Sequence, residues 1–114
     1  MPTIEAQIQT LLGNLCSGRC YPLVNTMATL ISPYITFQKI SGIPDMDLDG
    51  PGRENCRFQF DVWATTYSAA KTLAESVKTA MLGASFVNTP IMYSDLYEEV
   101  SKEYRVLLEY YIWP

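Results

Sequence analysis

The fold of this chain is decided by residues 56–64, which read CRFQFDVWA. Every second residue of this stretch is apolar: Cys56, Phe58, Phe60, Val62 and Ala64. Between them stand Arg57, Gln59, Asp61 and Trp63. Because successive side chains of a β-strand point to opposite faces, the alternation predicts a strand with one face in the core. A half-buried strand of this kind is typical of an antiparallel sheet.

A helix is predicted directly after this strand. Thr66 is a suitable N-cap, and Gly83 suits the position after the last helical residue, Leu82. The apolar stripe of this helix consists of small and medium-sized side chains that allow close approach to a sheet: Ala70, Leu73, Ala74, Val77, Ala80 and Met81.

The remaining elements follow from the same kind of pattern. An apolar stripe predicts a first helix from about Thr3 to Leu15, and Pro22 favours an edge strand within residues 19–24. Residues 25–33 are predicted as a loop, 34–40 as a strand and 45–52 as a turn or loop. Further strands are expected at 86–93 and 103–113, joined by an acidic connector over 94–102.

The predicted fold class is α+β, with the order α-β-β-β-α-β-β. We expect an antiparallel β-sheet of about four to five strands with two helices packed on one face. The last strand is amphipathic on its second face, so it is either central or covered by a partner. The second sheet face would be exposed and would carry large aromatic side chains, which indicate a protein partner. Its candidate contact residues are Gln59, Asp61, Trp63, Tyr111 and Trp113.

Composition favours one domain over residues 1–114 and excludes several classes of protein. The net charge is −4, and the 8 Lys and Arg residues are scattered singly, which does not favour attraction to nucleic acid. No apolar run approaches the roughly 20 residues of a membrane helix, and residues 1–9 lack the pattern of a signal peptide. We therefore expect no membrane association.

The residues offer little for catalysis or metal binding. The chain has no histidine, so a Ser-His-Asp or Cys-His arrangement is impossible. Cys16 and Cys20 have a CxxxC spacing, but at most three soft ligands exist, and we interpret the three cysteines as reduced core residues. The Asp45, Asp47, Asp49 series resembles the opening of a calcium loop, but Cys56 stands where the bidentate Glu belongs. We predict no enzyme, no metal and no cofactor.

Three segments together resemble the tail completion, or tail-to-head joining, proteins of long-tailed double-stranded DNA phages. They are RCYPLV at 19–24 leading to PYITFQ at 33–38, RFQFDVWATTY at 57–67 with its Ala-rich helix, and the C-terminal YRV and YYIW. The resemblance covers nearly the whole chain. It implies a structural protein of a phage or prophage, assembled in the cytoplasm of the bacterial host and located in the virion tail.

The resemblance further implies a hexameric ring that contacts the tail tube protein and the head completion or connector protein, with DNA passing through it unbound. Cyclic rings need two different patches on each subunit. The second sheet face could supply one of them. Contacts to the tube or connector could come from the loops with Asp45, Asp47, Asp49, Glu98 and Glu99, whose charge would repel DNA. The alternatives are a small cytosolic α+β ligand-binding or dimerising module, and an enzyme that uses carboxylates alone.

Overall fold

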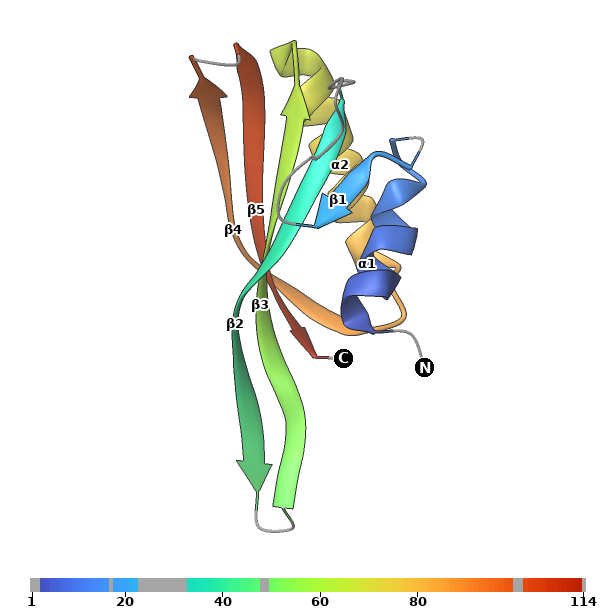
Figure 1. Cartoon of the computed structure of the whole chain (residues 1–114), viewed down its shortest axis with the longest axis vertical. Helices are drawn as coiled ribbons and strands as arrows, with labels where there is room; N and C mark the ends of the chain where they lie inside the picture. The colour runs from blue at the N-terminus through green and yellow to red at the C-terminus, as the bar shows by residue number, and fades with distance from the viewer. Residues whose placement is uncertain (1–2, 17, 23–32, 48–49, 100–101, 114) are drawn as a thin grey trace.

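The structure is a computed structural model that describes residues 3–16, 18–22, 33–47, 50–99 and 102–113 (Figure 1). Its elements in chain order are α1 (Ile4–Gly13), β1 (Cys20–Pro22), β2 (Tyr34–Asp47), β3 (Gly50–Ala64), α2 (Tyr67–Leu82), β4 (Val87–Glu98) and β5 (Glu103–Trp113). The predicted α+β class and the order α-β-β-β-α-β-β are confirmed.

The five strands form one sheet in the order β1-β2-β3-β5-β4. The pairs β2–β3, β3–β5 and β5–β4 are antiparallel, as predicted. The pair β1–β2 is parallel, so the sheet is mixed and the expectation of a wholly antiparallel sheet is wrong for this short edge strand. The last strand was expected to be either central or covered by a partner. It is central, because it lies between β3 and β4.

Both helices cover the same face of the sheet (Figure 1). The apolar residues of β3 from Cys56 to Ala64 are at most 1% exposed, as their alternation predicts. They share one core cluster with Ile8 and Leu12 of α1 and with Val77 of α2. The core therefore lies between the sheet and a single layer of helices.

Side-chain caps fix where both helices begin. The hydroxyl of Thr3 accepts a hydrogen bond from the backbone N–H of Ala6, and that of Thr66 accepts one from Ala69, each at 3.2 Å. The bounds predicted for α2 are confirmed, because Gly83 follows its last residue. Helix α1 ends at Gly13, two residues before the predicted end.

Two predicted connections are strands instead. Strand β4 continues to Glu98, so most of the predicted acidic connector at 94–102 belongs to the sheet. Strand β2 runs to Asp47 and β3 starts at Gly50, so most of the predicted turn at 45–52 is paired as well. Residues 43–47 and 50–55 of this hairpin lie beyond the end of β5 and form a two-stranded arm (Figure 1). The loop predicted at 25–33 lies outside the described residues apart from Pro33.

No helix in the described ranges is long and apolar enough to cross a membrane.

Candidate interaction surface

Trp63 lies on the helix-free face of the sheet, where it is held by contacts within the chain. Its Nε1–H donates a 3.0 Å hydrogen bond to the hydroxyl of Thr36 on β2. Its ring stacks on Tyr34 at 6.0 Å between centroids, and the guanidinium of Arg105 lies 5.2 Å from its ring centroid. These contacts leave Trp63 half-buried, so the prediction that it is freely exposed is only partly correct.

Asp61 is the second predicted contact residue, and it is also engaged by its neighbours. Its Oδ1 accepts a 2.9 Å hydrogen bond from Nε of Arg105, and the Gln59 amide donates to the same carboxylate at 3.0 Å and 3.2 Å. A second guanidinium nitrogen of Arg105 contacts Glu98 at 3.1 Å. Asp61 is 8% exposed, so its carboxylate is used for contacts within the chain and little of it is accessible to a partner.

Tyr111 and Trp113 lie on the same face, on β5. Their rings are 6.1 Å apart between centroids, and Tyr111 is exposed while Trp113 is half-buried. Trp63 pairs with Arg105 and Tyr111 pairs with Arg57, which places the two aromatic groups at different heights along the sheet. The structure thus brings Gln59, Asp61 and Trp63 together and sets the other two apart.

Several of the acidic residues that were predicted to lie in two loops belong to strands. Asp45 and Asp47 belong to β2 within the arm, and Asp49 lies outside the described residues. Glu98 ends β4 and pairs with an arginine, while Glu99 is exposed just after it. Within the described ranges, no three Asp, Glu, Cys or His side chains lie close enough together to hold a metal ion.

The cysteines are packed into the core. Cys16, Cys20 and Cys56 are buried and form no disulfide. The thiol of Cys16 donates to the carbonyl of Arg19 at 3.1 Å, and burial raises the pKa of Cys20 to about 12. A thiol with so high a pKa stays protonated at neutral pH and is a poor nucleophile.

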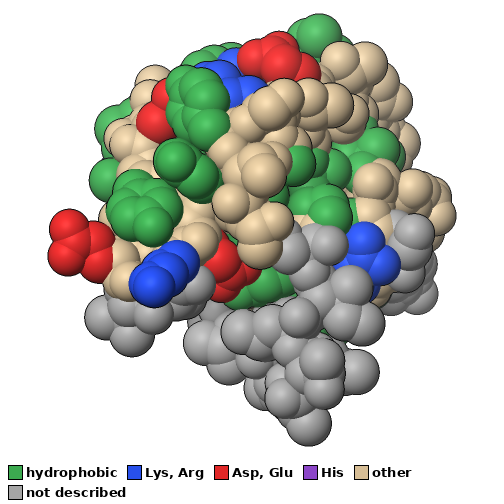
Figure 2. All heavy atoms as spheres, turned by 90° about the horizontal axis from the view of Figure 1, so that it is seen from above, with side chains coloured by type: hydrophobic (Ala, Val, Ile, Leu, Met, Phe, Trp, Pro, Cys, Tyr) green, Lys and Arg blue, Asp and Glu red, His purple; other side chains and the backbone are tan. Residues whose placement is uncertain are grey.

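The sequence-based prediction missed the most exposed apolar element, which is β4. It forms one edge of the sheet, and its large apolar residues project to both sides. The structure has ten exposed large hydrophobic side chains in the described ranges, and six of them are on this strand: Val87, Ile91, Met92, Tyr93, Leu96 and Tyr97. Hydrophobic side chains are visible on the surface seen from above in Figure 2, among a few charged groups.

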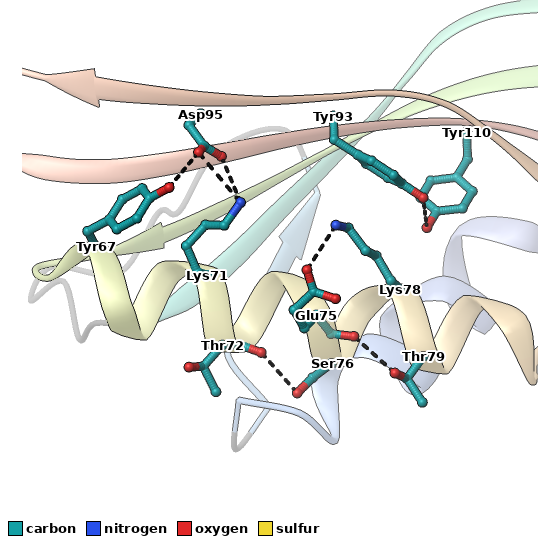
Figure 3. A network of polar contacts seen from close by, with 10 residues as sticks. All are labelled: Tyr67, Lys71, Thr72, Glu75, Ser76, Lys78, Thr79, Tyr93, Asp95 and Tyr110. Atoms are coloured by element: carbon teal, nitrogen blue, oxygen red, sulfur yellow. Dashed lines mark hydrogen bonds and ion pairs between the residues drawn. The ribbon is translucent and has the colours of Figure 1, made fainter.

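On the helix-covered face, β4 is tied to α2 by polar contacts (Figure 3). Asp95 accepts a 2.8 Å hydrogen bond from the hydroxyl of Tyr67 and contacts the Lys71 ammonium at 3.3 Å. The Tyr67 hydrogen bond, followed by Lys71, lowers the pKa of the Asp95 carboxyl. The Lys78 ammonium lies 4.1 Å from the ring centroid of Tyr93. These contacts fix the position of β4 while its edge stays open.

A hollow of about 320 Å³ lies between α2 and the start of β4, and Lys78, Asn88 and Tyr93 are among its lining residues. Its polar groups are used within the chain. The Asn88 amide donates to the carbonyls of Met81 and Phe86, and Lys78 pairs with Glu75 at 3.0 Å. The hollow therefore offers few polar groups to orient a small ligand.

Comparisons with known proteins agree with the resemblance. Residues 5–113 match the profile of a family described as tail completion protein gp17. A solved structure described as the virion of a native gene transfer agent particle matches with a TM-score of 0.73 and 20% identity, covering 90% of this chain and 82% of that chain. At this identity the match shows a shared fold. No curated protein matched. The family match spans nearly the whole chain. The chain therefore belongs to the tail completion protein gp17 family and is a structural protein of the phage virion tail.

Proposed function

We propose that this chain acts as one domain and as the subunit of a hexameric ring that completes the tail and joins it to the head. The observation that carries the proposal is the family match over residues 5–113. The proposed partners are the tail tube protein on one side and the head completion or connector protein on the other.

The surface of the chain supports a contact role. An edge strand with six exposed large apolar residues is poorly suited to an isolated protein, because such edges pair with other chains. The hollow between α2 and β4 offers few polar groups to a ligand, because those of Asn88 and Lys78 are used within the chain, and this does not favour the alternative of a ligand-binding module. Both observations favour a contact role over ligand binding.

Deletion of the gene tests the joining function. In its absence we expect DNA-filled heads and separate tails in electron micrographs of the lysate, and the wild-type gene supplied in trans should restore joined particles. Joined particles in the deletion lysate, or a lysate without any tails, would contradict the proposal.

We further propose that DNA crosses the ring without specific binding, since the chain carries a net charge of −4. Changing Asp45, Asp47, Asp49 and Glu99 to amides should slow DNA ejection from joined particles. Glu98 is best tested separately, because its removal also breaks the contact to Arg105. Ejection at the wild-type rate after the first set of changes would count against an acidic lumen.

A further inference from the structure

The exposed apolar side chains of β4 surround its free edge. Met92 and Leu96 lie opposite Glu109 and Arg105 and so share the helix-free face, whereas Tyr93 and Tyr97 point to the helix-covered face. All four are between 41% and 49% exposed. A partner that covers both faces of one strand and its edge is best formed by another strand with its own side chains on two faces.

Beyond Pro90, the edge of β4 has few of the devices that keep strands from pairing. Free edges are usually protected by lysine, proline or a bulge. Strand β4 has Pro90 and an irregularity between Pro90 and Met92, but residues 91–98 contain neither proline nor lysine. The opposite edge, β1, is three residues long and contains Pro22. The open part of β4 therefore has the features of a strand acceptor.

A second edge of the sheet has no neighbour over part of its length among the residues that the structure describes. Strand β1 pairs with β2 only at Ile35–Phe37, and no described strand lies beside β2 on that side from Gln38 onward. Since each neighbouring pair from β2 to β4 is antiparallel, β2 and β4 run in opposite directions. Two copies related by rotation about an axis along the strands would thus bring β4 of one beside β2 of the next as an antiparallel pair.

We propose that the subunits of the ring are joined by this pairing of β4 with β2 of the adjacent copy. The inference rests on the proposed ring and specifies the contact between its subunits, which is called the seam below. A ring needs two different complementary patches on each subunit, and two opposed edges of one sheet meet that need.

A register between β4 and β2 of the next copy that keeps the two sheet faces matched can be derived from the pairing within one copy. Gln38 lies level with Met92, through Gln59 and Glu109 on the strands between them. Shifting the next copy by four residues along the strands would place Gln38 opposite Leu96 on the helix-free face. It would place Lys39 opposite Asp95 on the helix-covered face, so that no like charges face each other at that position of the seam.

This shift is geometrically reasonable for a closed ring. Four residues correspond to about 13 Å along the strands and four strand spacings to about 19 Å across them, which gives a tilt of about 35°. Closed sheets adopt tilts of about that size. A shift by an odd number of residues would set residues of the helix-covered face opposite residues of the helix-free face, because the side-chain period of a strand is two.

A cysteine pair tests the seam. The double variant Gln38→Cys/Leu96→Cys is oxidised in the purified full-length chain and in particles assembled with it, and the products are separated without reductant. Within one copy the two positions are separated by two strands, about 14 Å or more, which is too far for a disulfide. We expect a ladder from dimer up to the closed ring. The matched control, Gln38→Cys/Thr79→Cys, places the second cysteine on the exposed face of α2 and should give no ladder.

Four results would overturn the seam. Abundant dimers from Leu96→Cys alone would indicate β4–β4 pairing, and a bond to the tail tube protein would indicate a different occupant. A ring seen by native mass spectrometry or in particles, without products larger than dimer, would reject the seam and leave the proposed function standing. Absence of a ring from both samples would reject the proposed function together with the seam.

Discussion

The guanidinium of Arg105 on β5 donates a 2.9 Å hydrogen bond from Nε to the carboxylate of Asp61 on β3. The pair lies on the helix-free face, and the side chains of Arg105 and Asp61 are 21% and 11% exposed. The same guanidinium reaches Glu98 on β4. Arg105 therefore links three adjacent strands on the face that neither α1 nor α2 covers.

Removing this arginine should destabilise the sheet. The variant Arg105→Met keeps much of the aliphatic stem but leaves Asp61 with the Gln59 amide as its remaining side-chain donor. A buried carboxylate that has lost its cationic partner is costly, so we expect a loss of about 2–4 kcal/mol in the free energy of unfolding, measured in urea. The control Lys78→Met removes a surface pair with Glu75 and a contact with the Tyr93 ring, each worth up to about 1 kcal/mol, and should cost less than Arg105→Met. Equal losses for the two variants would contradict this account.

Tyr34 should make the protein sensitive to alkaline pH. Burial, and then the nearby Glu103 carboxylate, raise the pKa of Tyr34 from 10.0 to about 12. Between these values the folded state keeps a proton that the unfolded state releases, so this contribution to stability is present below pH 10 and is lost toward pH 12.

The variant Tyr34→Phe removes that titration. Its urea midpoint should fall less steeply than that of the wild type when pH is raised above 10. Tyr97→Phe, which removes the hydroxyl of an exposed tyrosine, is the matched control. A wild-type pH profile in Tyr34→Phe would show that the phenol of Tyr34 is not responsible.

The N-cap of α2 should contribute measurably to stability. Thr66→Ala removes the hydroxyl that accepts the hydrogen bond from the backbone N–H of Ala69. We expect a loss of about 1 kcal/mol, and Thr66→Ser should retain most of it. Thermal unfolding followed by circular dichroism provides the measurement, and a serine variant as unstable as the alanine variant would argue against the cap.

The three cysteines should be unreactive in the folded protein. All are buried, and the pKa of Cys20 is raised to about 12. A thiol-specific dye at pH 8 should label them only after denaturant is added, because the thiolate is the reactive form. Rapid labelling of the native protein would contradict the packing of the core, and it would also require their replacement in the cysteine-pair experiment.

The local patterns of the sequence were sufficient for the parts of the fold that depend on neighbouring residues. The alternation from Cys56 to Ala64 predicts the buried face of β3, and Thr66 and Gly83 predict the ends of α2. Caps and alternating strands are local signals, so one sequence is enough to detect them.

What the sequence missed depends on pairing between distant residues. The stretch from Ser94 to Glu98 contains two acidic residues and follows Pro90, which favours a connector, but β5 provides it with a partner along its whole length. The parallel pairing of β1 and the contacts that bury Trp63 also depend on residues far away in the sequence. The exposed edge of β4 could therefore be recognised only once the strand order was known.

The central claim is that the chain forms a ring at the head-proximal end of the tail. Electron cryomicroscopy of joined particles that carry a tagged copy tests it most directly. The account predicts a closed ring of this chain between the tail tube and the head connector, with its sheets in contact with one another. Tag density anywhere else in the particle, or a junction in which the tube meets the connector without this chain, would contradict it.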